Sequence, residues 1–170
     1  RMREENEEQE EELRRSKGMG RVKAITIKAA LEIGRRSMLQ EPFWKNKQIT
    51  CPQDSKVFFE NMMVNLVKEE VHALLLDTRH RVIRHTVISS GGLASTGIFP
   101  REIFREAIKA NAAAIVIAHN HPSGDPKPSP DDIATTNSLD KSANLLGISL
   151  IDHIIIGRGT SSSLKELGFL

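Results

Sequence analysis

The spacing of apolar and polar positions along residues 51–170 predicts both strands and helices. The run AAAIVIA (112–118) is wholly apolar and rich in Ile and Val, so it predicts a buried central strand. Polar residues 77–80 separate two strand-like runs, which indicates a hairpin. Because strands and helices interleave, we expect an α/β fold with a mixed β-sheet flanked by helices. In chain order the pattern predicts a helix after Pro52, strands over 69–76 and 81–89, a helix from Pro100, the strand over 112–118, a helix after Ser129 and a strand over 148–156.

The N-terminal third of the chain follows a different pattern. Residues 1–8 are strongly acidic and predict a disordered start. The glycines Gly18 and Gly20 predict a tight turn, because glycine adopts positive φ without strain. Apolar positions then recur at helical spacing, and we expect that helix to stop near Gly34 or shortly after. Residues 38–50 contain a proline and several polar residues, and they read as a linker.

Composition narrows the class of protein. Of the 170 residues, 39% are hydrophobic and 27% are charged, which is typical of a globular domain. No apolar run reaches the ~20 residues of a membrane span, so we expect no membrane partner. The single cysteine, Cys51, excludes a disulfide framework, a Cys-rich zinc finger and an iron–sulfur cluster, and it favours a cytoplasmic location. Residues 18–50 carry seven basic and two acidic side chains, which suits either a phosphate-facing surface or a solvated helix face.

The run HNHPSGDPKPSPDD, residues 119–132, follows the predicted central strand and carries the clearest chemistry. His119 and His121 are two positions apart, so on a strand their rings point to the same face and can share a metal ion. Asp132 can add a carboxylate from the following helix start, which leaves a fourth tetrahedral position open, as in catalytic zinc sites. Each part has a plainer interpretation: Ser129 before Pro130 is also a good helix cap, and two such histidines are often merely exposed. The combination at fixed spacing favours the metal site.

This combination resembles the JAMM motif of JAB/MPN metalloproteases, in which H-x-H is followed by a serine and, three residues after it, an aspartate. The runs LLLDTRHRVI, FPREIFREAIKANA, NAAAIVIAHNHPSGDPKPSPDD and LLGISLIDHIIIG are similar to the bacterial RadC family over nearly all of residues 51–170. One departure is Phe99, where RadC-like chains commonly have His. The resemblance implies a JAB/MPN domain with cytidine-deaminase-like layering, and one Zn²⁺ per chain bound by His119, His121 and Asp132.

The same resemblance implies hydrolysis of an amide bond in a peptide or protein substrate by a metal-activated water. The general base would be a glutamate on the first strand, and the candidates are Glu69 and Glu70. The family register selects Glu69, although a slip of one residue would exchange their faces. Both glutamates could instead simply end the preceding helix in solvent. Ser129 would donate a hydrogen bond to the developing oxyanion.

Two further residues, Asp152 and His153, lie in the last predicted buried strand. They could hydrogen-bond the metal ligands from behind. The interpretation favoured for His153 is nevertheless a core histidine whose ring is satisfied by its neighbours.

The run KGMGRVKA resembles the hairpin and second helix of a helix-hairpin-helix unit, here spanning residues 9–37. RadC-like proteins carry such a unit before the JAB domain, and it would meet a DNA phosphate through backbone amides and basic side chains. A small helical packing module is the alternative. The alternative function is therefore that of a DNA-associated accessory protein, of the kind labelled as DNA repair, in which the JAB domain is a scaffold. The complete set of expected metal ligands favours the zinc-dependent hydrolase instead. Substrate identity and oligomeric state are open. The expected DNA contacts are Lys17, Gly18, Gly20, Arg21 and Lys23.

Overall fold

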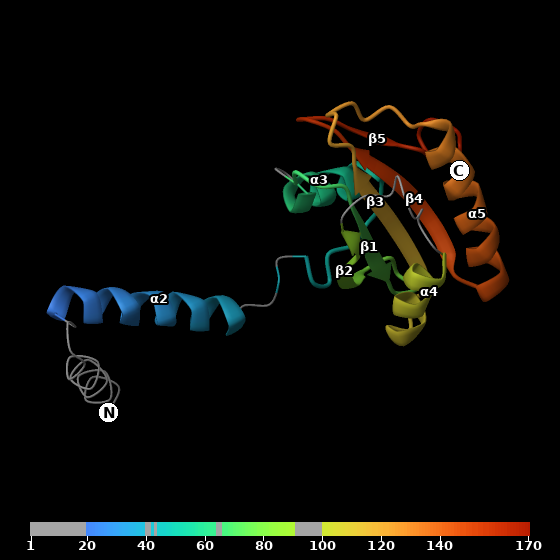
Figure 1. Ribbon diagram of the computed structural model, residues 1–170. Helices are drawn as coiled ribbons and strands as arrows, with labels where there is room; N and C mark the ends of the chain where they lie inside the picture. The colour runs from blue at the N-terminus through green and yellow to red at the C-terminus, as the bar shows by residue number, and fades with distance from the viewer. Residues whose placement is uncertain (1–19, 40–41, 43, 64–65, 91–99) are drawn as a thin grey trace. The chain divides into compact units, whose positions relative to one another are not determined.

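The computed structural model describes residues 20–39, 42, 44–63, 66–90 and 100–170. The chain divides into two compact units, Arg1–Pro42 and Phe43–Leu170. The first contributes one described helix, and the second contributes the remaining elements. In chain order these are α2 (Arg21–Leu39), α3 (Pro52–Met63), β1 (Glu70–Leu76), β2 (Val82–Ser90), α4 (Pro100–Lys109), β3 (Ala114–Asn120), α5 (Pro130–Leu146), β4 (Ser149–Ile156) and β5 (Ser161–Ser163) (Figure 1).

The second unit is built on a mixed five-stranded sheet of order β2-β1-β3-β4-β5. Strand β1 pairs antiparallel with β2 and with β3, β3 pairs parallel with β4, and β4 pairs antiparallel with β5. The parallel pair is joined through α5, as parallel neighbours require a crossover. This architecture confirms the predicted α/β class with a mixed sheet flanked by helices.

Each face of the sheet is covered by helices (Figure 1). Helix α3 covers one face, where Phe58 and Phe59 pack on Leu74 and Val116. Helices α4 and α5 cover the other face, where the core is assembled from alternate strand residues such as Ile115. The wholly buried pattern of β3 follows from this cover on both sides.

A β-bulge interrupts the pairing of β3 with β4. Ile115 pairs with Leu150, whereas the next residue, Val116, pairs with Asp152. Ile151 is therefore an extra residue on β4. A bulge of this kind inverts the alternation of side chains beyond it, so it decides which residues of β4 face α5.

The structure differs from the expectations at several element bounds. Helix α2 does not stop near Gly34 but continues to Leu39, because a single exposed glycine weakens a helix by only about 1 kcal/mol. Residues 44–50, expected to be part of a linker, belong to the second unit: Ile49 is 3% exposed, and Gln48 forms an isolated antiparallel β-bridge with Arg81. The central strand begins and ends two residues later than predicted, and the short strand β5 was not predicted.

None of the described helices is long and apolar enough to cross a membrane. The predicted acidic start, the Gly18 turn and Phe99 lie outside the described residues.

Candidate metal centre

Two histidines stand at the carboxyl end of the central strand. His119 lies in β3, pairs with Val71 of β1 and is fully buried. His121 follows the strand directly, and its N–H still donates to the carbonyl of Ile156 at 2.9 Å. This continued pairing keeps the two rings together, as their spacing predicts. Their Nε2 atoms lie 2.9 Å apart.

The third side chain comes from the first turn of α5. Ser129 is the N-cap, Pro130 is the first helical residue, and Ser129 forms a capping box with Asp132. Oδ1 of Asp132 lies 3.2 Å from Nε2 of His119, and its Oδ2 lies 3.4 Å from Nε2 of His121. Asp132 is therefore a cap residue and a candidate metal ligand at the same time, so the two interpretations of this segment do not compete.

The donor set of this site matches that of catalytic zinc sites. Nδ1 of His121 lies 2.7 Å from the carbonyl oxygen of Asp125, which only accepts, so Nδ1 carries the proton and Nε2 presents a lone pair. That lone pair meets Nε2 of His119 at hydrogen-bond distance, and the contact is favourable only with a proton or a cation between the rings. The ligand atoms of His119, His121 and Asp132 all lie within 4.8 Å of one another. Two imidazole nitrogens and a carboxylate oxygen fit Zn²⁺.

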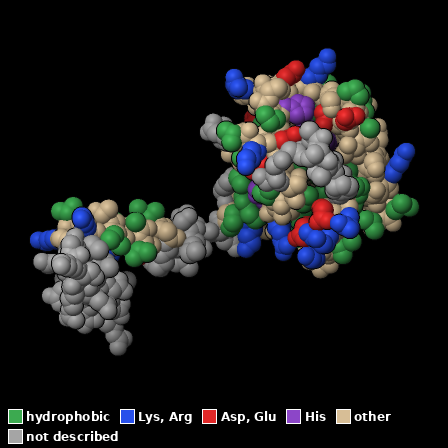
Figure 2. All heavy atoms as spheres, viewed as in Figure 1, with side chains coloured by type: hydrophobic (Ala, Val, Ile, Leu, Met, Phe, Trp, Pro, Cys, Tyr) green, Lys and Arg blue, Asp and Glu red, His purple; other side chains and the backbone are tan. Residues whose placement is uncertain are grey.

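The charges around the site also favour a bound cation. Burial raises the pKa of Asp132, but the rings of His119 and His121, when protonated on Nε2 in the absence of a metal, outweigh it and hold that pKa well below its usual value. The Asp132 carboxylate raises the pKa of His121 by a hydrogen bond, against the opposing effect of burial, with smaller contributions from the Asp125 carbonyl and the charge of Glu69. Figure 2 shows histidine at the surface of this unit beside acidic side chains.

The strand register assigns the two candidate bases to opposite sides of the sheet. Glu69 directly precedes β1, so it shares the phase of Val71, the residue that pairs with His119. Glu70 belongs to the other phase, and its carboxylate lies 2.9 Å from Nε2 of His72. The register thus places Glu69, rather than Glu70, on the side of the candidate metal site.

Asn120, the residue between the two histidines, was not singled out by the sequence analysis. Its side-chain Nδ2 donates to the carbonyl of Lys68 at 3.0 Å, and its Oδ1 accepts from the N–H of Glu70 at 2.8 Å. These bonds hold the two peptide groups that flank Glu69. The only signal of this contact in the sequence was the position of Asn120 between His119 and His121.

The hydroxyl of Ser129 is engaged with the candidate ligand. Its Oγ accepts from the N–H of Asp132 at 3.1 Å, as the capping role requires. The hydroxyl proton is donated to Oδ2 of the same side chain at 2.7 Å. For the expected oxyanion role, this proton would have to turn from Asp132 to the substrate.

His153 is both a core residue and a partner of the site. It is fully buried, as the favoured interpretation requires. Its Nε2 lies 2.8 Å from Nδ1 of His119, and its Nδ1 lies 2.6 Å from the hydroxyl of Thr136. His153 thus also lies behind a candidate metal ligand, as the alternative interpretation expected. Thr136 carried no recognisable signal in the sequence.

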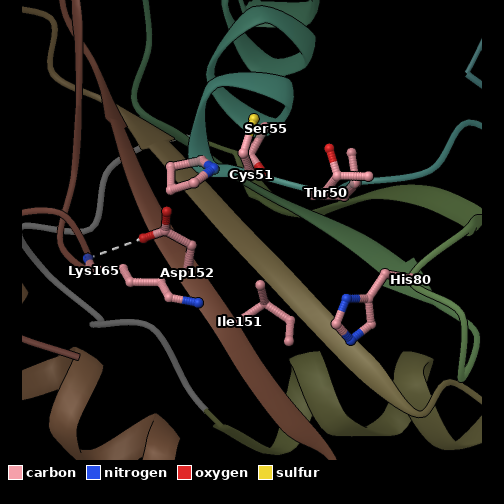
Figure 3. A pocket seen from close by; sticks show the side chains of 9 residues that line it. Thr50, Cys51, Ser55, His80, Ile151, Asp152 and Lys165 are labelled. Atoms are coloured by element: carbon pink, nitrogen blue, oxygen red, sulfur yellow. Dashed lines mark hydrogen bonds between the residues drawn. The ribbon is translucent and has the colours of Figure 1, made fainter.

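Asp152 faces away from the metal centre, into a small cavity of about 110 Å³ beside the start of α3 (Figure 3). Its carboxylate accepts hydrogen bonds from the Ser163 hydroxyl and from the backbone N–H groups of His153 and Lys165. Burial raises its pKa, and these hydrogen bonds oppose the rise. Ser55 also lines the cavity, and within the part of the chain that the structure describes its buried hydroxyl has no hydrogen-bond partner.

The expected DNA contacts fall only partly within the described residues. Lys17 and Gly18 lie outside them. Gly20 directly precedes α2, and Arg21 and Lys23 are exposed on its first turn. That turn carries no acidic side chain.

Comparison with known proteins identifies one family. The family model of the RadC-like JAB domain matches residues 49–169. A UPF0758 protein of Staphylococcus carnosus is 46% identical over 153 residues, which cover 90% of this chain and 67% of the relative. UPF0758 proteins of Shouchella clausii and Desulforamulus reducens are 42% and 43% identical to this chain. Each match covers 94% of this chain, and the two matches cover 69% and 70% of the respective relatives. These names state no activity.

Proposed function

Because the chain belongs to the RadC-like JAB domain family, we propose that its second unit is a zinc-dependent hydrolase of amide bonds in peptides or proteins. The observation that carries this proposal is the convergence of His119, His121 and Asp132, whose ligand atoms lie within 4.8 Å of one another. Both imidazoles offer Nε2 to the same point, next to a carboxylate that stays ionised. A Zn²⁺ bound there would supply Lewis acidity and lower the pKa of a water to about 7.

The residues around the metal would divide the proton and charge transfers between them. Glu69 would take a proton from the attacking water and later give it to the leaving amine. Ser129 would turn its hydroxyl from Asp132 and donate to the oxyanion that forms on the carbonyl oxygen when the water attacks the carbonyl carbon. His119, His121 and Asp132 would hold the metal in place and would keep the same protonation states throughout the reaction.

Three observations support Glu69 as the base. It lies in the strand phase that faces the metal side. Its charge is close enough to raise the pKa of His121. Asn120 holds the peptide groups on either side of it, which limits the motion of this segment. Glu70, by contrast, is engaged with His72 on the other face.

A peptide-cleavage screen with paired variants tests the proposal. Zinc-loaded parent protein would be incubated with peptide and isopeptide libraries, and the products identified by mass spectrometry. Glu69→Gln should lower the cleavage rate by about 10²–10⁴-fold. Glu70→Gln is the matched control and should stay close to the parent. Zinc-loaded parent that cleaves no amide substrate, or Glu69→Gln with full activity, would contradict the proposal.

We propose DNA association as a second function, located in the first unit. The supporting observation is the start of α2, where Arg21 and Lys23 are exposed and no acidic side chain is present in the first turn. A double Arg21→Glu, Lys23→Glu variant should bind duplex DNA more weakly and with a shallower salt dependence than the parent. Unchanged binding and salt slope would remove these residues from any DNA contact.

A further inference from the structure

A chain of hydrogen bonds runs from one candidate ligand into the protein interior. Nδ1 of His119 lies 2.8 Å from Nε2 of His153, whose Nδ1 lies 2.6 Å from the Thr136 hydroxyl. Thr136 donates in turn to the backbone carbonyl of Asp132 at 2.7 Å. We propose that His153 and Thr136 are positioning residues that fix the tautomer of His119 and hold it against the helix turn that carries Asp132. This inference rests on the metal site of the proposed function.

The inner end of the chain sets the direction of its protons. A carbonyl oxygen only accepts, so the one hydroxyl proton of Thr136 is committed to Asp132. Thr136 must therefore accept from Nδ1–H of His153, whose Nε2 is left as an acceptor. His119 then carries its proton on Nδ1, and its Nε2 presents a lone pair to His121. The opposite order would leave the short contact between Thr136 and the Asp132 carbonyl without a proton.

The bulge in β4 is what brings His153 to this face. If β4 kept a regular alternation from Leu150 onward, His153 would point toward α3, and the bulge at Ile151 turns it to the α5 side instead. Beyond the bulge, Asp152 accepts from the backbone N–H of His153 at 2.7 Å, and Ser163 and the backbone of Lys165 hold the same carboxylate. The local backbone is thus fixed by side-chain hydrogen bonds at the point where the ladder is irregular. Bulges next to functional sites commonly re-aim a side chain in this way.

A histidine that only fills core volume needs a partner for each ring nitrogen, but these partners can be any polar groups. Here both partners of the His153 ring are connected to the candidate metal site. One is the ring of His119, and the other is Thr136, which is bonded to the backbone of Asp132. His153 therefore links ligands that come from two different elements, β3 and α5. Groups that orient metal-bound histidines typically change metal affinity by 10–100-fold when removed.

Conservative substitutions separate this role from a purely structural one. Thr136→Val keeps the shape of the side chain and removes the hydroxyl, whereas Thr136→Ser keeps the hydroxyl and is the matched control. His153→Leu removes the acceptor for His119, whereas His153→Gln can still accept from His119 and donate to Thr136. Circular dichroism and thermal unfolding of each variant without zinc would verify that it is folded.

The first readout is zinc affinity, measured by competition with a chelating dye. Thr136→Val and His153→Leu should bind zinc about 10–100-fold more weakly than the parent, while Thr136→Ser and His153→Gln should bind close to the parent. The absorption spectrum of bound Co²⁺ should change with the first pair and stay as in the parent with the second. Equal zinc affinity in all folded variants would overturn the inference.

The second readout does not require metal. ¹⁵N NMR of the ring nitrogens should find Nδ1 of His119 and Nδ1 of His153 protonated, and Nε2 of His153 unprotonated. An unprotonated Nδ1 on His119 would overturn the inference. A parent protein that binds no zinc would contradict the proposed function instead, and the NMR result would then decide the hydrogen-bond chain alone.

Discussion

Asn120 accepts a hydrogen bond from the backbone N–H of Glu70 at 2.8 Å and so joins the candidate ligand strand to the segment that carries Glu69. Its other side-chain atom donates to Lys68, on the far side of Glu69. Asn120 is 4% exposed, so neither of its partners is readily replaced by water. One side chain between the two histidines therefore ties the segment that carries the candidate base to the strand that carries the candidate ligands.

Substitution of Asn120 by alanine should loosen Glu69 without removing the metal. Loss of two buried hydrogen bonds should lower the free energy of unfolding by about 1–3 kcal/mol. Hydrogen exchange measured by mass spectrometry should be faster over residues 68–70, while zinc content stays as in the parent. Asn144→Ala, which removes an exposed asparagine from α5, is the control and should change neither the hydrogen exchange of residues 68–70 nor the zinc content. Unchanged exchange over residues 68–70 in Asn120→Ala would show that the side chain does not hold this segment.

Protonation of His85 should lower the free energy of unfolding at mildly acidic pH. Burial, with a smaller contribution from the charge of His72, lowers the pKa of His85 from 6.5 to about 4. On acidification the unfolded chain therefore takes up this proton first. The stabilisation is complete above pH 6.5 and is lost as the pH falls toward about 4. Because the ring is only partly buried, we expect a loss of about 1–2 kcal/mol.

The difference between parent and His85→Gln in urea unfolding, measured at several pH values, isolates this contribution. Glutamine keeps a donor for His72 but does not titrate, so the difference should grow with pH between about 4 and 6.5 and be constant above 6.5. A difference that is the same at every pH would show that His85 has an ordinary pKa in the folded protein.

Gly157 should be intolerant of any side chain. A Cβ at this position would lie 2.5 Å from the carbonyl oxygen of Gly124 and 2.8 Å from Pro126, both in the loop that follows His121. Gly157→Ala should therefore displace this loop, lower the free energy of unfolding by at least about 1–3 kcal/mol and weaken zinc binding. Gly34→Ala is the contrasting control, because a Cβ at this exposed position of α2 has no atom of the described residues outside its own helix backbone within 4 Å. A Gly157→Ala protein as stable as the parent would contradict this close approach.

Ser55 should be replaceable by alanine at no cost in stability. Its hydroxyl is buried beside the cavity of Figure 3 and has no hydrogen-bond partner among the described residues, so its removal eliminates a desolvated polar group. Thermal unfolding of Ser55→Ala should occur at the same temperature as the parent or higher. Ser163→Ala, which removes a hydrogen bond to Asp152, should lower the transition temperature instead. A Ser55→Ala protein destabilised as much as Ser163→Ala would indicate a partner for the Ser55 hydroxyl.

The sequence was informative where a local rule decides the structure. The apolar run before His119 predicted the central strand, and Ser129 with Pro130 predicted the start of α5. The same rules predicted that the rings of His119 and His121 share one side and that Asp132 lies in the first turn of the following helix, whereas the expectation that the three meet came from their combined spacing and from the family resemblance.

Other features depend on contacts between distant segments, and no local pattern encodes them. The bulge at Ile151 is visible only in the pairing of β4 with β3, so the orientation of His153 could not be read from periodicity. Thr136 meets His153 only because α5 packs on β4. Local rules also did not predict that α2 continues beyond Gly34 or that Ile49 packs in the core.

The central claim is that His119, His121 and Asp132 bind one zinc ion per chain. The most direct test is metal content by plasma mass spectrometry after zinc loading and dialysis, on the parent, His119→Ala and the control His80→Ala, whose histidine lies in the β1–β2 turn. The account predicts one zinc per chain in the parent and in His80→Ala, and none in His119→Ala. A parent protein that retains no zinc, or a His119→Ala protein that retains as much as the parent, would contradict it.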